Sequence, residues 1–438
     1  MNLILLSGGS GKRLWPLSNN IRSKQFIKLF RNENGEYESM VQRMYTGIKK
    51  VDPNADITIA AGRQQLSLIH NQLDTSVDIS VEPARRDTFA AIVLACTYLH
   101  DVKKIGEEEP VVICPVDPYV DSSYFKALMR LSDLAGAGTA SLNLLGIEPT
   151  YPSEKYGYII PKTKEEVSAV SMFREKPDVK TAEQYIAQGA LWNAGVFAFR
   201  LSWILEKGHE LLDFTDYYDL YAKYETVEKI SFDYAVAEKE PSIQVMRYRG
   251  DWKDLGTWNT FTEAMDSPLI GNAFMDEACR NVHVINALDM PVLVMGLQNT
   301  VVAASPSGIL VADKERSSYL KPYAERFEDK VMFAEKSWGS YEVIDADDES
   351  LTIKITLKAG SRMNYHRHEH RDEMWTVIAG NGRTIVDGMV QPVKAGDVVT
   401  MQAGCCHAVE AETELKIIEV QLGKDIDVRD KIKYSWPE

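Results

Sequence analysis

The chain has 438 residues, of which 45% are apolar and 26% charged, a composition typical of a folded globular protein. Its net charge of −15 excludes a broadly basic surface, so neither nucleic acid nor an anionic membrane is expected as a partner. No apolar stretch approaches the roughly 18 residues of a membrane span, and the five cysteines contain no C-x-x-C pair. We therefore expect a cytoplasmic protein of two or three domains, without a disulfide framework.

The first predicted element is a short buried strand over Leu3–Leu6, which runs into the glycine-rich loop LSGGSGKRLWPLS at residues 6–18. The loop fits neither a P-loop nor a dinucleotide-binding loop, because Arg13 and Leu14 stand where those patterns require Ser or Thr and Gly. Its glycines still let backbone N–H groups approach an anion, and Lys12 and Arg13 add positive charge. A phosphate-binding loop and a strand-end turn with a solvated Lys-Arg pair both remain open.

Beyond this loop, about 250 residues alternate β-rich runs with helical patterns, such as Glu38–Val51 and Thr88–Val102. The further strand candidates are Ile57–Ala61, Val111–Cys114, Ser141–Gly146 and Gly195–Phe199. This alternation predicts an α/β, Rossmann-like domain with a mostly parallel sheet, whose ligands gather at the carboxyl ends of the strands.

After residue 264 the pattern of apolar and turn-forming residues changes twice. Short apolar runs separated by Asn, Asp, Pro and Gly predict a small β-rich segment, and from Val331 to about Gln421 strands and turns follow in the pattern of a β-sandwich or barrel. The predicted domains are residues 1–264, 265–330 and 331–438.

A histidine cluster lies in the last of these domains, in NYHRHEHRDEMW at residues 364–375. On a strand His366, His368 and His370 would share one face, and Glu373 could complete the group. Imidazole and carboxylate ligands suit Zn, Fe, Mn, Co or Ni, so the pattern favours a transition-metal site. The alternative is a set of surface histidines on an edge strand.

The spacing resembles the cupin family, whose first motif, G-x5-H-x-H-x4-E-x6-G, is met in full by Gly360, His366, His368, Glu373 and Gly380. The second motif is met by Gly396, Gly404 and His407, whereas Gln402 and Ala411 depart from it. The resemblance implies a double-stranded β-helix with a metal held by His366, His368, Glu373 and His407.

Seven further motifs follow the glycine loop in order. They are RSKQF (22–26), EPARRDT (82–88), CPVDPYV (114–120), EKYGYI (154–159), FREKPD (173–178), LWNAGVF (191–197) and WKDLGTW (252–258). Together they resemble the sugar-1-phosphate nucleotidyltransferases, and among these the mannose-1-phosphate guanylyltransferases. The resemblance covers nearly the whole chain, because the type II branch, the bifunctional phosphomannose isomerases/guanylyltransferases, carries a C-terminal cupin.

The resemblance implies transfer of GMP from GTP to mannose-1-phosphate, giving GDP-mannose and pyrophosphate, by a protein that forms a homodimer. A second activity, interconversion of mannose-6-phosphate and fructose-6-phosphate in the cupin, is left open. The alternative is a nucleotidyltransferase for another sugar-1-phosphate or base, with a non-catalytic cupin that dimerises or senses sugar.

The resemblance also implies roles for individual residues. Nucleotide binding falls to Leu6, Gly8, Gly9, Gly11, Lys12, Arg13, Glu82 and Arg85. Catalysis falls to Arg13, Lys24, Asp117 and Asp254, of which Asp117 and Asp254 hold Mg²⁺, an ion that prefers oxygen ligands. Sugar-phosphate binding falls to Gly157, Tyr158, Glu175, Lys176, Asn193 and Gly195.

Plainer roles stay open for some of these residues. Asp117 could be a turn residue before Pro118, Asp254 a helix N-cap, and Glu175-Lys176 a solvated pair. The chain also departs from the family: PVDP stands where PADH is usual, and His366 stands where the type II isomerases commonly have Gln. Isomerase activity is therefore less firmly implied than nucleotidyl transfer.

Overall fold

The computed structural model covers residues 1–438 and describes all of them except 10, 20–21, 328–330, 425, 427–429 and 437–438. The described residues form two compact units. The first comprises Met1–Ser10, Ser23–Leu66 and Gln72–Asp266, and the second comprises Gly11–Arg22, Ser67–Asn71 and Ser267–Glu438.

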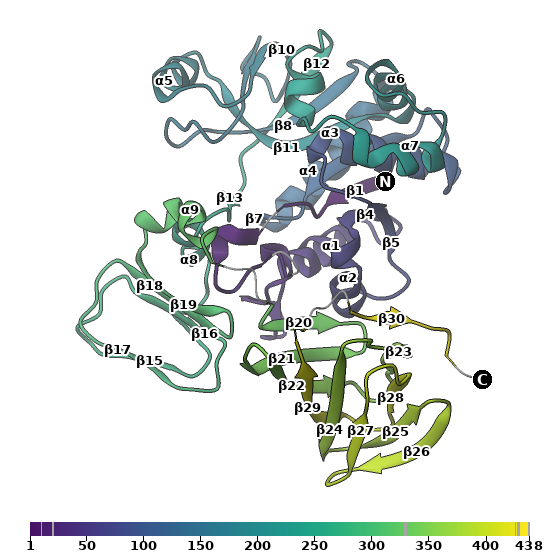
Figure 1. Ribbon diagram of the computed structural model, residues 1–438. Helices are drawn as coiled ribbons and strands as arrows, with labels where there is room; N and C mark the ends of the chain where they lie inside the picture. Colours follow the sequence, from purple (N-terminus) through teal and green to yellow (C-terminus); the bar gives the residue numbers. More distant parts are fainter. Residues whose placement is uncertain (10, 20–21, 328–330, 425, 427–429, 437–438) are drawn as a thin grey trace. The chain divides into compact units, whose positions relative to one another are not determined.

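A nine-stranded sheet forms the centre of the first unit (Figure 1). Its order is β5-β4-β1-β6-β11-β8-β12-β10-β9, and only β10 and β11 run against the others. The bounds are β1 (Asn2–Leu6), β4 (Asp56–Gly62), β5 (Asp78–Glu82), β6 (Pro110–Pro115), β8 (Leu142–Ile147), β9 (Tyr158–Pro161), β10 (Val167–Arg174), β11 (Leu191–Arg200) and β12 (Ile243–Tyr248). The predicted α/β class with a mostly parallel sheet is confirmed.

Helices cover this sheet along its length. The helices of the first unit are α1 (Met40–Val51), α3 (Asp87–Asp101), α4 (Ser122–Ala137), α5 (Val179–Ala187), α6 (Leu201–Leu211), α7 (Tyr217–Lys223) and α8 (Trp258–Thr262), whereas most of α2 (Leu66–Gln72) belongs to the second unit. α3 packs against β1, β4 and β5, whereas α4 packs against β6, β8 and β11. Because both faces are covered, the central strands are largely apolar, as at the fully buried run Val111–Cys114 of β6.

Two short ribbons accompany the sheet. One joins β2 (Phe30–Arg31) to β3 (Tyr37–Glu38), and the other joins β7 (Pro118–Val120) to β13 (Trp252–Asp254). The second ribbon matters for function, since it brings together two motifs more than a hundred residues apart.

The second unit contains, after residue 266, a coil of short strands. Its strands are β14 (Leu269–Ile270), β15 (Ala273–Met275), β16 (His283–Asn286), β17 (Val292–Val294), β18 (Thr300–Ser305) and β19 (Gly308–Asp313), followed by α9 (Lys321–Ala324). β14, β16 and β18 are parallel neighbours, as are β15 and β17, so successive turns of chain stack on one another. The predicted β-rich middle segment has this form.

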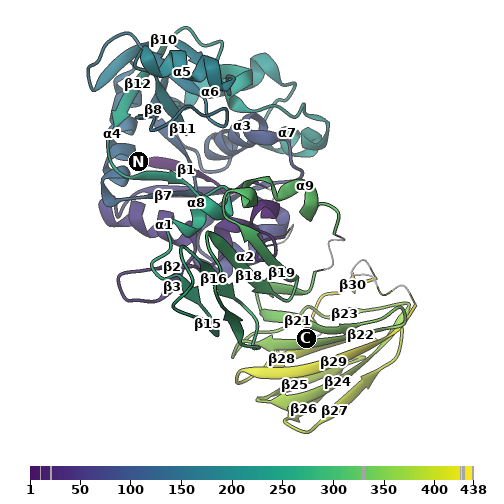
Figure 2. The same ribbon diagram turned by 90° about the vertical axis from the view of Figure 1, so that its left-hand side faces the viewer.

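Two antiparallel sheets make up most of the chain after residue 332 (Figure 2). The first has the order β20-β21-β22-β29-β24-β27 and the second β26-β25-β28-β23-β30. The bounds are β20 (Phe333–Lys336), β21 (Gly339–Ala346), β22 (Ser350–Leu357), β23 (His366–Arg367), β24 (Arg371–Ala379), β25 (Asn381–Val386), β26 (Met389–Lys394), β27 (Val398–Met401), β28 (His407–Ala411), β29 (Leu415–Gly423) and β30 (Ile432–Lys433). Both sheets supply side chains to one core, including Ile355, Trp375 and Val409, as the predicted double-stranded β-helix requires.

The helices of both units are short. Among the helices that the structure describes, none is long and apolar enough to cross a membrane.

Candidate active site and metal-binding group

The β7–β13 ribbon brings the two predicted Mg²⁺ carboxylates together. Asp117 leaves the carboxyl end of β6 just before β7, and Asp254 ends β13 directly opposite Pro118. Lys24 contacts both segments. Its Nζ lies 2.7 Å from Asp117 Oδ2 and donates to the carbonyl of Leu255, the residue after Asp254, at 3.4 Å. A cation and two carboxylates thus occupy one end of the sheet, as phosphoryl-transfer chemistry requires.

A pocket of about 200 Å³ contains these carboxylates together with most of the predicted sugar residues. Its lining consists of Pro115, Asp117, Pro118, Lys155, Tyr156, Gly157, Glu175, Asn193, Ala194, Gly195, Asp233, Trp252 and Asp254. Residues from several separate motifs therefore meet at the carboxyl end of the parallel strands, where such sheets bind ligands.

Glycine is required at two positions of this pocket. A Cβ on Gly157 would overlap Glu175 Oε2, so any side chain there would displace the carboxylate. Gly195 has φ +69°, a left-handed conformation that glycine adopts without strain. Its N–H donates to Asn193 Oδ1 at 3.0 Å and thereby helps to fix the amide.

Two carboxyl groups, the buried Glu175 and the partly buried Asp233, face the same pocket. Asn193 Nδ2 donates to Asp233 Oδ1 at 2.8 Å, and the Lys176 ammonium pairs with Glu175 Oε1. Burial and the neighbouring charge of Glu175 raise the pKa of Asp233 to about 7. Groups of this kind exchange hydrogen bonds with sugar hydroxyls.

Asp233 and the aromatic wall of the pocket were not predicted from the sequence. Tyr156 packs between Trp192 and Trp252, with ring centroids 4.7 and 5.8 Å away. All three aromatic residues stand inside motifs of the sequence; Tyr156 and Trp252 line the pocket, whereas Trp192 is buried and contacts Tyr156. For Asp233 the one available signal was an acidic residue within the otherwise apolar run Phe232–Ala237.

Two of the predicted sugar residues lie outside the pocket lining. Tyr158 is fully buried, and its hydroxyl bonds with the backbone N–H and carbonyl of Ser153, so its ring has a core position. Lys176 is half exposed and reaches the pocket through its ion pair with Glu175.

Glu82 and Arg85 lie at and after the carboxyl end of β5, at the edge of the sheet. The Tyr224 hydroxyl donates to Glu82 Oε2 at 3.1 Å, and burial raises the pKa of Glu82 to about 7. Arg85 is exposed. Neither residue lines the pocket described above.

The glycine loop leaves β1 beside the chain that leads to Asp117. Leu6 and Pro115 are register partners on the parallel strands β1 and β6, and the Val116 N–H donates to the Leu6 carbonyl at 3.2 Å. Gly8 and Gly9 are exposed, and Gly9 has φ +122°. The remaining loop residues are Gly11, Lys12 and Arg13. They begin a 3-10 turn that belongs to the second unit, and the Arg13 side chain is exposed.

In the double-stranded β-helix, four buried side chains form a compact group: His366, His368, Glu373 and His407. Their ligand atoms all lie within 4.8 Å of one another. His366 and His407 are register partners on β23 and β28, and Glu373 projects from β24 of the facing sheet. The expectation that His370 shares their face is wrong: it is exposed, because β23 ends at Arg367 and the alternation of faces ends with it.

The hydrogen bonds of this group favour metal binding through Nε2. Each imidazole uses Nδ1 on a backbone carbonyl: His366 on Asn364 at 2.7 Å, His407 on Cys405 at 3.0 Å, and His368 on Asp430. Such contacts fix the tautomer and leave Nε2 unprotonated. Burial also lowers the pKa of His366 to about 2, so this ring stays neutral.

Two polar atoms of the group have no hydrogen-bond partner, although both are buried. These are Glu373 Oε2 and His407 Nε2, which approach each other to 3.1 Å. Arg371 Nε donates to Glu373 Oε1 at 3.1 Å, and its Nη2 donates to His368 Nε2 at 3.0 Å. A metal ion would satisfy the unpartnered atoms, so the donor set fits such an ion.

Two family models match the chain and together span most of it. The nucleotidyl transferase family model matches residues 2–269, and a model of the C-terminal region of mannose-6-phosphate isomerase matches residues 326–435. The chain is 28% identical over 472 residues to xanthan biosynthesis protein XanB of Xanthomonas campestris pv. campestris, covering 99% of this chain and 97% of that protein. It is also 28% identical over 477 residues to a mannose-1-phosphate guanylyltransferase of Escherichia coli, with 99% and 97% covered.

One solved structure supports the fold assignment for most of the chain. It is described as a mannose-1-phosphate geranyltransferase from Thermus thermophilus and superposes with a TM-score of 0.62 at 27% identity. The match covers 74% of this chain and 98% of that one.

Proposed function

The chain belongs to the nucleotidyl transferase family, and we propose that it transfers GMP from GTP to mannose-1-phosphate, giving GDP-mannose and pyrophosphate. The observation that carries the proposal is the pocket in which Asp117 and Asp254 meet Glu175, Asn193 and the aromatic wall. The relatives named as mannose-1-phosphate guanylyltransferases support the choice of substrates.

In this reaction a phosphate oxygen of the sugar attacks the α-phosphorus of GTP, and the bond from that phosphorus to the bridging oxygen of pyrophosphate breaks. Lys24 is proposed to neutralise the developing charge, and the backbone N–H groups of Gly8 and Gly9 to bind phosphate oxygens. Glu175, Asp233 and Asn193 orient the sugar through its hydroxyls. Gly157 and Gly195 leave room for the sugar, and Lys176 pairs with its phosphate.

Both family matches imply the use of divalent metal ions. For nucleotidyl transfer we propose Mg²⁺, which Asp117 and Asp254 would hold; when bound it would offset the negative charge of the phosphates. The domain boundaries at 264 and 330, which come from the sequence pattern, remain predictions, as does the homodimer. The roles of Leu6, Gly11, Lys12, Arg13, Glu82 and Arg85 in nucleotide binding, of Arg13 in catalysis and of Tyr158 in sugar binding also remain predictions.

A second activity is favoured by the buried histidine group. We propose that His366, His368, Glu373 and His407 hold Zn, Co, Mn, Fe or Ni, and that the barrel interconverts mannose-6-phosphate and fructose-6-phosphate. A metal there would polarise the sugar carbonyl, which makes the neighbouring C–H acidic. The competing proposal is a cupin that binds sugar or dimerises without catalysis.

A substrate panel tests the transferase. Purified full-length protein with Mg²⁺ is mixed with each of four NTPs and with mannose-1-phosphate or glucose-1-phosphate, and pyrophosphate release is measured. We expect the fastest release with GTP and mannose-1-phosphate. Faster turnover of another pair would replace the proposed substrates, and no turnover of any pair would refute nucleotidyl transfer.

The Asp233→Asn variant tests the carboxyl pair. A carboxyl pKa raised to about 7 means that the folded state favours the protonated form, so this group lowers stability as the pH rises from about 4 through 7. The variant should therefore gain more in Tm at pH 8 than at pH 5. It should also raise KM for the sugar phosphate about 10-fold, because the amide cannot reproduce the hydrogen bond of the carboxyl group to the sugar.

The matched control is Asp133→Asn, which changes an exposed aspartate on α4. It should alter neither KM nor the pH dependence of Tm. If the two substitutions changed KM and the pH dependence of Tm equally, Asp233 would not be part of the proposed sugar site.

A further inference from the structure

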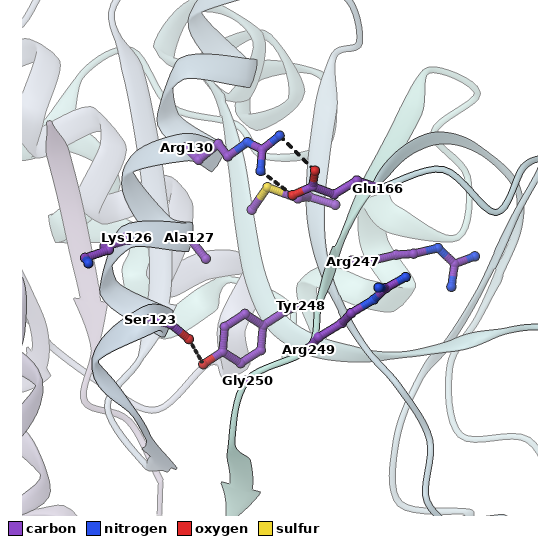
Figure 3. Close-up of a pocket in the computed structure, with 10 residues that line it drawn as sticks. Ser123, Lys126, Ala127, Arg130, Glu166, Arg247, Tyr248, Arg249 and Gly250 are labelled. Atoms are coloured by element: carbon purple, nitrogen blue, oxygen red, sulfur yellow. Dashed lines mark hydrogen bonds and ion pairs between the residues drawn. The ribbon is translucent and has the colours of Figure 1, made fainter.

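A second pocket on the first unit lies between α4 and the end of β12 (Figure 3). Its volume is about 460 Å³, larger than the pocket at Asp117, and the two share no lining residue. The lining consists of Ser123, Lys126, Ala127, Arg130, Glu166, Met246, Arg247, Tyr248, Arg249 and Gly250. Nothing in the proposed reaction uses it.

The charge of this pocket is opposite to that of the chain. Its lining has four cations and one carboxylate, whereas the whole chain carries −15. Arg247 is already engaged: its side chain is 8% exposed and binds Glu148 and the carbonyls of residues 163 and 165. Among the described residues no ion pair neutralises Lys126 or Arg249, so the pocket retains positive charge.

The remaining cation, Arg130, pairs with Glu166, and an anionic ligand can take the place of this carboxylate. Arg130 and Glu166 form a two-point ion pair across the upper rim in Figure 3, and both side chains are more than half exposed, at 54% and 57%. Exposed pairs of this kind are worth little, so a more highly charged anion can replace the carboxylate.

The opposite wall is preorganised rather than a mobile surface. Ser123 Oγ and Tyr248 OH are hydrogen-bonded at 3.0 Å, and Tyr248 OH donates to Asp121 Oδ1 at 3.3 Å. Asp121 Oδ2 in turn accepts from the Asp251 N–H at 2.7 Å. A Cβ on Gly250 would overlap Tyr248 OH, so the chain passes this wall closely.

We propose that this pocket is a second anion site, which takes a ligand with a diphosphate group, either inorganic pyrophosphate or a nucleoside diphosphate. Arg130 and Arg249 bind the phosphates, and Glu166 competes with the ligand for Arg130. Two phosphates match the surplus of cations, and the volume leaves room for a nucleoside beside them.

The test is calorimetric titration of the full-length protein with inorganic pyrophosphate without divalent metal, a condition in which Asp117 and Asp254 repel the anion. Wild type should bind one equivalent. Arg130→Gln with Arg249→Gln should weaken binding at least about 10-fold, since two charge-assisted contacts are lost. Glu166→Gln should strengthen it, because Arg130 loses its competitor.

The control pair is Lys180→Gln with Lys239→Gln, which removes the same charge from lysines outside the pocket. It should leave the affinity close to that of wild type. No binding to wild type, equal loss in both pairs, or weaker binding to Glu166→Gln would overturn the proposal.

A second titration with GDP separates the two sources of the diphosphate. Tighter pocket-dependent binding of GDP than of pyrophosphate identifies a nucleotide ligand, whereas equal affinity identifies the diphosphate group alone. Neither titration depends on turnover, so failure of this site and failure of the proposed transferase remain distinguishable.

Discussion

Replacing Asp117 by Asn is expected to lower kcat for nucleotidyl transfer by about 10²–10³-fold, the loss typical of removing one electrostatic contact to the reacting phosphate. The substitution keeps the shape of the side chain but removes the charge that faces Lys24 at 2.7 Å and that would hold Mg²⁺ beside Asp254. Because Asp117 follows β6 in a turn and is 37% exposed, the fold should survive. Pyrophosphate release at saturating substrates measures the effect.

Asp251→Asn provides the matched control, since Asp251 is an exposed aspartate three residues before Asp254 and lies outside the pocket lining. Its kcat should remain within about twofold of wild type, as is usual for an exposed side chain away from the reacting groups. A fall in kcat shared by both variants would point to a general charge effect. A fully active Asp117→Asn protein would exclude Asp117 as a ligand for the catalytic metal.

Much of the first unit could be predicted because the signals were local. The apolar run before the glycine loop and the run Val111–Cys114 are too short for helices and too apolar for surface strands, so they predicted buried strands. The parallel pairing of β1 with β6 then places residue 6 beside residue 115. The resemblance in motif order is confirmed by the nucleotidyl transferase match over residues 2–269.

Long-range packing explains what the sequence could not predict. Asp233 reaches the pocket at Asp117 because the chain returns through a single π-helical turn whose Asp233 side chain bonds with Asn193 of β11, and no local pattern specifies that return. Tyr158 belongs to a recognisable motif, yet its side chain is buried, and its hydroxyl accepts from the Ser153 N–H and donates to the Ser153 carbonyl. Motif membership identified the segment, whereas the direction of each side chain depended on the pairing of β9 with β10 and β11.

In the histidine cluster, too, the local pattern identified the segment, whereas long-range contacts decided which side chains are buried. Strand alternation predicted one face for His366, His368 and His370, but β23 ends at Arg367. His368 is nevertheless buried, since its Nδ1 binds the Asp430 carbonyl from a segment 62 residues away. The Asp430 carboxylate accepts from the backbone N–H groups of Glu369 and His370, which turns the chain and leaves the His370 side chain exposed.

His368→Ala is therefore expected to remove tight binding of a transition metal, lowering the affinity by at least about 10²-fold, because the loss of a direct ligand exceeds that of its supporting contacts. Isomerisation of fructose-6-phosphate should disappear with it. Nucleotidyl transfer should be unchanged, since no residue of the histidine group lines the pocket at Asp117. Elemental analysis of the purified protein and separate assays of the two reactions measure these effects.

The neighbouring His370→Ala variant distinguishes metal ligation from a general loss of imidazole in the same segment. His370 is exposed, and its side chain is not part of the group within 4.8 Å, so metal content and both activities should match wild type. Retention of the metal by His368→Ala would refute the proposed ligand set. If His368→Ala loses the metal but keeps its isomerase activity, the metal does not take part in that reaction. If the metal-loaded wild type has no isomerase activity, the result favours a cupin that only binds.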